Sequence, residues 1–220
     1  METLGGIDEA GRGAVIGPLV IAGVTINKKD IIKLTELNIK DSKMLTKNQR
    51  ENLFPKILSI ATSYRIEIIH PQEIDNAVMG NNSLNLNKLE ANYTAKIINL
   101  LNPDEVIIDC PSNNILTYKE YFIRFIEKRE IKILLEHKAD INYPIVSSAS
   151  IIAKVTRDDE IEKIKKKINI DFGSGYPSDP LTKEFLKGNI TKHPDIFRKS
   201  WSTVRRINKT KSEINLYSFK

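Results

Sequence analysis

The sequence predicts an α/β domain built on a mixed β-sheet. Two apolar segments near the N-terminus, residues 4–8 and 16–26, are predicted to be strands with no helix between them. Further along, apolar strands alternate with segments of helical periodicity. With 220 residues, the chain can bury the core of one domain and still carry a small attachment.

The remaining elements follow from the spacing of apolar side chains. Three further strands are predicted, at residues 64–69, 105–109 and 131–135. Apolar residues at helical spacing predict four helices, at residues 47–59, 84–101, 118–128 and 146–168. After Asp171 the sequence becomes rich in glycine and proline and then basic. We therefore predict a core at residues 1–168 and a helical C-terminal extension at residues 169–220.

Composition excludes several classes of protein. The chain is 40% hydrophobic and 28% charged, which is typical of globular domains. No apolar run reaches the roughly 18 residues needed to cross a bilayer, and residues 1–4 lack the pattern of a secretory signal. The only cysteine, Cys110, excludes an intrachain disulfide and a cysteine-based metal site, and we expect a small buried thiol. A cytoplasmic protein is expected.

The charge distribution favours a polyanionic partner. The net charge is +6, and basic residues gather at residues 163–167 and 192–211. The run of three lysines at residues 165–167 has a plainer interpretation as a solvated helix face. His70, His137 and His193 are too far apart for a metal-binding spacing, and we interpret them as structural or surface residues.

Acidic residues stand at the ends of predicted strands. Asp8 and Glu9 close the first strand, Asp109 closes another, and Asp140 follows the strand that begins at Ile131. Carboxylates that converge repel one another unless a cation neutralises them, and oxygen ligands suit Mg²⁺ or Mn²⁺. The alternative for any single aspartate is a turn or a helix cap.

A set of motifs resembles the signature of type 2 ribonuclease H, or ribonuclease HII. The first is Gly-Ile-Asp-Glu-Ala-Gly-Arg-Gly at residues 6–13, which continues to Pro18. The others follow in the family's order up to about residue 201, at residues 41–43, 108–109, 138–140, 147–158 and 173–180. The version at residues 173–180, Gly-Ser-Gly-Tyr-Pro-Ser-Asp-Pro, is similar to that of the archaeal branch.

The resemblance implies a fold and a reaction. The fold would be the ribonuclease H fold, a five-stranded mixed sheet flanked by helices, with a helical C-terminal extension closing the substrate groove. The reaction would be hydrolysis on the 5′ side of a ribonucleotide, leaving a 3′-hydroxyl and a 5′-phosphate. Substrates would be the RNA of RNA/DNA hybrids and ribonucleotides embedded in duplex DNA. Two ions of Mg²⁺ or Mn²⁺, about 4 Å apart, would assist.

The resemblance also assigns roles to residues. Asp8, Glu9, Asp109 and Asp140 would form the metal centre. The segment Gly11-Arg12-Gly13 would present its backbone to the ribose 2′-hydroxyl, and Tyr176 would stack on the following sugar. The remaining expected substrate contacts, each with a structural role as its alternative, are Lys43, Ser147, Ser150, Lys154, Arg157 and Arg198. For the serines this alternative is helix capping rather than phosphate binding.

Other functions remain open at this point. A non-catalytic nucleic-acid binder would show affinity without turnover. A junction resolvase could share the acids but has no need of a ribose-reading loop. A nucleotide-handling ATPase would require a phosphate-binding loop of the Gly-x-x-x-x-Gly-Lys-Ser/Thr type, which the sequence lacks. We expect a monomer, and although a sliding clamp is conceivable as a partner, no motif in the sequence supports one.

Overall fold

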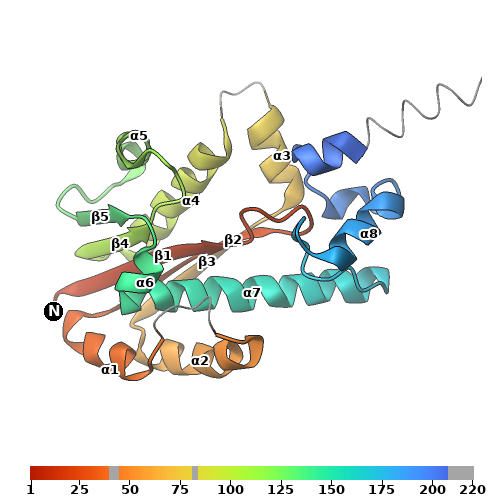
Figure 1. The fold of residues 1–220 in the computed structure, drawn as a ribbon. Helices are drawn as coiled ribbons and strands as arrows, with labels where there is room; N and C mark the ends of the chain where they lie inside the picture. Colours follow the sequence, from red (N-terminus) through yellow and green to blue (C-terminus); the bar gives the residue numbers. More distant parts are fainter. Residues whose placement is uncertain (40–44, 81–83, 208–220) are drawn as a thin grey trace, which may run out of the picture. The chain divides into compact units, whose positions relative to one another are not determined.

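The computed structural model describes residues 1–39, 45–80 and 84–207, and it contains a mixed five-stranded sheet (Figure 1). The strands are β1 (Thr3–Ala10), β2 (Leu19–Asn27), β3 (Ser63–Ile69), β4 (Glu105–Asp109) and β5 (Lys132–Glu136), in the order β3-β2-β1-β4-β5. β1 runs antiparallel to β2, and β4 runs parallel to both β1 and β5. The predicted α/β class with a mixed sheet is confirmed.

Eight α-helices and three short 3₁₀-helices are present in the described part of the chain. The α-helices are α1 (Ile31–Glu36), α2 (Lys47–Ile60), α3 (Pro71–Met79), α4 (Leu86–Leu101), α5 (Ile115–Phe122), α6 (Ala139–Asn142), α7 (Pro144–Ile168) and α8 (Pro180–Asn189). The 3₁₀-helices are η1 (Lys28–Asp30), η2 (Ile123–Phe125) and η3 (Pro194–Ile196). Within the described ranges, no helix combines the length and the apolar character that a membrane crossing requires.

The chain divides into two compact units. The first comprises Met1–Ala10, Val20–Ile68 and Leu86–Arg157, and the second comprises Gly11–Leu19, Ile69–Asn85 and Asp158–Lys220. The sheet belongs to the first unit, apart from the end residues of β2 and β3. The second unit has its own apolar core, in which the Phe185 ring lies 5.4 Å from that of Phe172 and 5.9 Å from that of Phe197. The division of the chain at residue 168 stays a prediction.

Two glycines bring helices close to the two faces of the sheet in the first unit. A Cβ atom at Gly6 on β1 would lie 2.4 Å from the carbonyl oxygen of Ile145, at the start of α7. A Cβ atom at Gly23 on β2 would lie 2.4 Å from Ile97 on α4. In Figure 1, α1, α2 and α7 cover one face, and α4 and α5 cover the other. Because side chains alternate along a strand, each strand residue faces one of these two helical layers.

Several predicted boundaries differ from the structure. The second strand begins at Leu19 instead of Ile16, because residues 11–17 form a loop in which Gly17 has a positive φ of 81°. The helix predicted at residues 118–128 begins at Ile115, after an Asn114 cap, and its α-helical part ends at Phe122. It continues only as the 3₁₀-helix η2.

Four helices of the structure were not predicted individually. They are α1, α3, α6 and α8. α3 begins at Pro71, shortly after β3 ends at Ile69; proline suits the first helical position because no donor is needed there. Lys43, predicted to contact substrate, lies outside the described residues.

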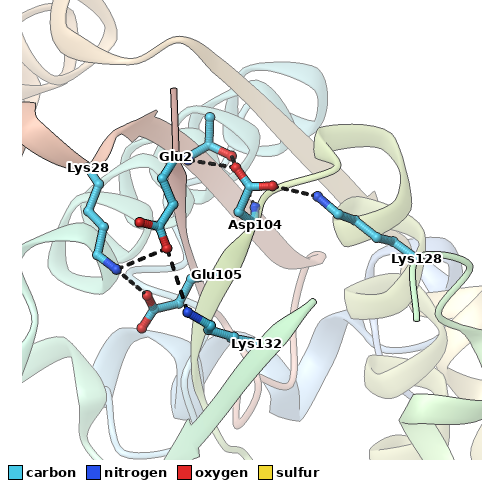
Figure 2. Close-up of polar contacts among 7 residues, drawn as sticks. Glu2, Lys28, Asp104, Glu105, Lys128 and Lys132 are labelled. Carbon is cyan, nitrogen blue, oxygen red and sulfur yellow. Dashed lines mark hydrogen bonds and ion pairs between the residues drawn. The ribbon is translucent and has the colours of Figure 1, made fainter. Parts of the chain in front are cut away.

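A network of ion pairs links the strand ends that lie opposite the predicted acidic centre (Figure 2). Lys28 bridges Glu2 and Glu105, with Nζ–O distances of 3.3 and 2.7 Å. The Asp104 carboxylate accepts hydrogen bonds from the backbone N–H and the hydroxyl of Thr3, at 2.9 and 3.0 Å, and pairs with Lys128 at 2.8 Å. These contacts connect β1 with β2 and with the turn before β4.

We expect Asp104→Asn to lower the melting temperature slightly at neutral pH. Hydrogen bonds from Lys128 and Thr3 hold the pKa of Asp104 well below its usual range. Because the folded-state pKa lies below that of the unfolded chain, the stabilisation is present above about pH 4 and disappears as the pH falls further. The pair is exposed, so the loss should be about 1–3 °C at pH 7 and should shrink towards pH 2 in thermal unfolding.

The control for this measurement is Glu120→Gln on the exposed surface of α5. It should leave the melting temperature unchanged at every pH. A difference between Asp104→Asn and the wild type that stays constant from pH 7 to pH 2 would contradict the assigned role of the charge.

Candidate active site

Asp8 and Asp109 occupy neighbouring positions at the carboxyl ends of two adjacent strands. The parallel register of β1 and β4 pairs Ile7 with Ile108, so Asp8 and Asp109 are the next residues on the two strands. Ile107 packs in the core with α7 residues, as do Leu4 and Ala10 of β1. By strand alternation, Asp8 and Asp109 therefore face the α7 side of the sheet together. This juxtaposition is the one that the strand-end argument predicts.

Burial and like charge act together on Asp8. Its side chain is buried, and loss of hydration raises its pKa, with the Asp109 carboxylate raising it further, to about 7. A hydrogen bond from Ser150 and the backbone N–H of Glu9, at 2.7 Å, act in the opposite direction. A carboxylate in this position is costly to ionise in the absence of a neighbouring cation.

Helix α7 supplies the groups that offset this cost. Ser150 is buried and hydrogen-bonds Asp8, and Lys154, one turn later, donates from its Nζ to the Ser150 hydroxyl at 2.9 Å. The Lys154 charge also lowers the pKa of Asp8. Both residues were predicted as substrate contacts, and in the structure their described partners are Asp8 and each other.

The residue that precedes Asp140, at the start of α6, contacts Asp109. Asp109 accepts a hydrogen bond from the backbone N–H of Ala139 at 3.1 Å, and Ala139 directly precedes Asp140. The turn into α6 requires Lys138 to adopt a left-handed conformation with φ of 59°. Asp140 is 1% exposed, so it is an interior carboxylate rather than a surface charge.

Glu9 lies on the opposite side of the sheet from Asp8. It follows Asp8 on β1 and so points towards the layer of α4 and α5. There, burial raises the pKa of Tyr118 on α5 well above its usual range, and the carboxylates of Glu90 and Glu9 raise it further. Cys110, buried as predicted, is also on this side. Glu9 therefore shares its surroundings with Glu90 in this structure.

The described residues contain a pair of carboxylates rather than a complete metal cage. Nowhere in residues 1–39, 45–80 and 84–207 do three His, Cys, Asp or Glu side chains stand together closely enough to hold a metal ion. Asp8 and Asp109 nevertheless fit a divalent cation, because they are oxygen ligands whose mutual repulsion a positive charge would relieve. The four-residue centre stays a prediction.

The predicted ribose-reading segment forms an ordered loop in the second unit. Gly11 has a positive φ of 88°, a conformation that other residues rarely adopt. Gly13 is different: it is exposed, and a Cβ atom there would meet no heavy atom within 4 Å. Packing in the protein therefore does not require glycine at residue 13.

Arg198 holds this loop from within the second unit. Its side chain is fully buried, with Nη1 donating to the Arg12 carbonyl at 2.8 Å and Nε donating to the Gly17 carbonyl at 3.1 Å. Its backbone N–H donates to the Val15 carbonyl at 3.0 Å, beside a bridge between Ile16 and Phe197. Arg198 was predicted to contact substrate, and the structure places its guanidinium on the loop backbone.

The segment that carries Tyr176 contacts the same loop. The Gly175 carbonyl accepts hydrogen bonds from the backbone N–H groups of Val15 and Ile16, at 2.9 and 3.2 Å. Asp179 orders the turn by accepting from the N–H and hydroxyl of Ser174, both at 2.7 Å. Tyr176 itself is half-buried. Two motifs separated by more than 150 residues therefore form one hydrogen-bonded structure.

The two other predicted contacts that are described are interior residues of α7. The Ser147 hydroxyl donates to the Ile39 carbonyl, and Ser147 is fully buried. Arg157 is 4% exposed. Sequence reasoning also missed the roles of Asp75 and Thr182, polar residues that hold loops of the second unit and have no distinctive local pattern. The loop-holding role of Asp179 was missed as well, although Asp179 stands in the motif at residues 173–180 and caps α8 before a proline.

The comparisons with known proteins agree with the motifs. The family model described as Ribonuclease HII matches residues 5–204. The chain belongs to the ribonuclease HII family. It is 47% identical to the Ribonuclease HII of Pyrococcus furiosus, over 98% of this chain and 97% of the relative, and 45% identical to that of Methanococcus maripaludis strain C6, over 97% and 90%.

Solved structures show the same fold. The ribonuclease H2 structure from Pyrococcus horikoshii superposes with a TM-score of 0.84 at 42% identity, covering 94% of this chain and 98% of that one. The ribonuclease HII from Archaeoglobus fulgidus, solved as a complex described as PCNA:RNase HII, gives a TM-score of 0.81 at 38% identity, covering 91% and 95%. Ribonuclease HII enzymes are metal-dependent endonucleases that act on RNA/DNA hybrids, and the predicted enzyme class is confirmed.

Asp8→Asn should stabilise the metal-free protein while abolishing nuclease activity. Because the pKa of Asp8 is raised to about 7 in the fold, the native state binds an extra proton, and stability falls as pH rises from about 4 through 7. In EDTA, we expect the wild-type melting temperature to fall by about 5 °C or more between pH 5 and pH 8. The variant should lose most of this dependence, and an equal fall in both proteins would contradict the charge assignment.

Gly13→Ala should separate folding from ribose recognition. Since a Cβ atom at residue 13 meets no protein atom, we expect melting temperature to change by less than about 1 °C. Activity on a ribonucleotide-containing duplex should fall by at least about tenfold, since the methyl group would occupy the approach of the ribose. Gly11→Ala is the contrasting variant, expected to lower the melting temperature because of its positive φ.

Proposed function

We propose that this ribonuclease HII cuts the phosphodiester bond on the 5′ side of a ribonucleotide, both in RNA/DNA hybrids and in duplex DNA that contains single ribonucleotides. The placement of the buried Asp8 beside the partly buried Asp109 at adjacent strand ends is the observation that carries this proposal. A pair of repelling carboxylates is unfavourable for the fold alone and is suited to hold divalent cations beside a phosphate.

The proposed ligands are Asp8, Glu9, Asp109 and Asp140. Because Glu9 points to the other side of the sheet in this structure, its side chain would have to turn around the end of β1 to join the other three. Two ions of Mg²⁺ or Mn²⁺, when bound, would supply activation of the attacking water and neutralise the charge on the departing oxygen. Ser150 and Lys154 would hold Asp8 in place through the hydrogen bonds described above. Water adds to phosphorus as the bond to the 3′ oxygen of the preceding nucleotide breaks, giving a 3′-hydroxyl and a 5′-phosphate.

Ribose specificity is assigned to the loop of the second unit. The backbone of Gly11-Arg12-Gly13 would contact the 2′-hydroxyl, the one group that distinguishes RNA from DNA. The exposed, unobstructed position of Gly13 supports this role, because no packing contact explains the glycine. Tyr176, on the segment bonded to the same loop, would stack on the next sugar. Lys43, Ser147 and Arg157 remain proposed phosphate-side or structural residues.

The expected partners follow from charge and from relatives. The net charge of +6 supports binding to a nucleic-acid backbone, and we propose a cytoplasmic monomer. The relative from Archaeoglobus fulgidus is described in a complex with PCNA, which makes a sliding clamp a proposed partner of this chain as well. The C-terminal residues 208–220 lie outside the described residues.

A DNA duplex carrying one ribonucleotide tests the proposal. With Mg²⁺ or Mn²⁺ we expect incision only on the 5′ side of the ribose, and none in an all-DNA duplex of the same sequence. EDTA should abolish cutting, and Asp109→Asn should reduce it by about 10³-fold or more, since a like-sized neutral side chain removes a charged ligand.

The products and controls define the outcome. End-labelled fragments should carry a 3′-hydroxyl upstream and a 5′-phosphate downstream. Glu120→Gln, on the surface of α5, should cut at the wild-type rate. Equal cutting of both duplexes would reject ribose recognition, and tight binding without cutting would favour the non-catalytic alternative.

A further inference from the structure

Asp75 on α3 is a buried carboxylate that binds the backbone of a distant segment. It is 7% exposed and accepts hydrogen bonds from the backbone N–H groups of Lys199 and Ser200, both at 2.8 Å. It also accepts from the Ser200 hydroxyl at 2.6 Å. α3 was not predicted from the sequence. Asp75 is separated from Lys199 by 124 positions in the sequence and from Ser200 by 125.

The residues that Asp75 holds flank Arg198 on its C-terminal side. Arg198 donates its guanidinium to the carbonyls of Arg12 and Gly17 and its backbone N–H to that of Val15. These carbonyls all belong to the loop that carries Gly11, Arg12 and Gly13. A continuous set of hydrogen bonds therefore runs from Asp75, through residues 198–200, to the loop, all of it within the second unit.

The hydrogen bonds that run from Asp75 through residues 198–200 to the loop depend on the charge of Asp75 and on the rigidity of the Arg198 guanidinium. Hydrogen bonds to an ionised carboxylate or from a guanidinium are stronger than neutral ones, and the planar guanidinium holds its acceptors in a fixed geometry. In Asp75→Asn one carboxylate oxygen becomes an amide nitrogen, which cannot accept a hydrogen bond, so the backbone N–H of either Lys199 or Ser200 loses its acceptor and the segment must shift to satisfy it. A shift of residues 199–200 displaces the Arg198 backbone and, with it, the loop carbonyls.

We propose that Asp75 is a positioning residue that sets the ribose-reading loop through Arg198. The inference rests on the proposed function, in which this loop contacts the 2′-hydroxyl. Asp75 itself touches no substrate. Its effect is on the preference for a ribonucleotide rather than on the general affinity for duplex DNA.

The chain offers a matched control on the same helix. Gln72, one turn before Asp75, also links α3 to the C-terminal segment, donating from Nε2 to the backbone and side-chain oxygens of Asp195 at 3.3 and 3.4 Å. These contacts are exposed and do not involve residues 198–200. Gln72→Ala therefore weakens the attachment of α3 without acting on Arg198.

The test measures binding to a single-ribonucleotide duplex and to an all-DNA duplex, with every variant made in an Asp109→Asn background and measured in EDTA, so that cutting does not interfere. The dissociation constant for the all-DNA duplex divided by that for the ribonucleotide-containing duplex measures the preference for ribose. We expect Asp75→Asn to reduce this ratio by about tenfold, the loss of about one charge-assisted hydrogen bond at the loop. Affinity for the all-DNA duplex should stay within about twofold, and Gln72→Ala should leave the ratio unchanged.

A double-mutant cycle identifies the route of the effect. Arg198→Lys should reduce the same ratio, and combining it with Asp75→Asn should add little further loss, because both act on one connected set. Additive effects would overturn the assignment of Arg198 as the intermediary. Equal losses of affinity for both duplexes, or an unchanged ratio in Asp75→Asn, would overturn a positioning role in specificity.

Hydrogen exchange separates this proposal from the proposed function. The backbone N–H groups of Val15 and Ile16 should exchange faster in Asp75→Asn than in Gln72→Ala, because the loop that they anchor to Gly175 is loosened. If the parent protein shows no ribose preference, the proposed function fails and the specificity role of Asp75 falls with it. Unchanged exchange in a protein that does prefer ribose would reject the positioning role alone.

Discussion

The parallel pairing of β1 with β4 places two carboxylates side by side at the carboxyl ends of two inner strands. The other features of the predicted metal centre follow from this placement. Because Ile7 pairs with Ile108, the next residues along both strands are aspartates that face the same helical layer. Burial removes the hydration of Asp8, and the neighbouring Asp109 charge adds to this effect, so the pKa of Asp8 is raised to about 7. The pairing of β1 with β4 in the sheet therefore also places two negative charges where they repel each other.

In the second unit, the loop of residues 11–17 has to be held in a defined position while the space beside Gly13 stays open. At Gly13 the loop is exposed, with open space at the Cβ position, whereas the side chains of Val15 and Ile16 pack in the apolar core of the second unit. The loop backbone is also held by hydrogen bonds from the guanidinium of Arg198 and to the carbonyl of Gly175. Buried charged groups are costly unless fully hydrogen-bonded, and here that bonding is directed at main-chain carbonyls.

These two arrangements differ in how far the sequence reveals them. Strand-end acids are visible because a carboxylate after an apolar run stands out, and parallel strands bring such ends together; Asp8 and Asp109 could therefore be paired in advance. The side of the sheet to which each acidic side chain points could not be predicted, because it depends on the register of the strands. Glu9, for example, points to the opposite side from Asp8. Likewise, the sequence marked Arg198 as part of a basic element but gave no sign that its partners are carbonyls some 180 residues away. The links made by Asp75 are equally long-range and leave no local pattern.

Helix α7 shows why a functional segment can read as an ordinary core helix. Its small residues Ala149 and Ala153 are fully buried against the sheet, and this close packing is what lets the neighbouring Ser150 reach Asp8. Lys154 then adds a positive charge on a long, flexible side chain, which lowers the pKa of Asp8 without occupying the strand end permanently. A fixed arginine at that position would neutralise the aspartates more strongly and would compete with a divalent cation for the same oxygens. Lys154 thus partly offsets the negative charge, so that the metal-free protein stays folded while the carboxylates stay available to a cation. A metal-dependent nuclease requires both.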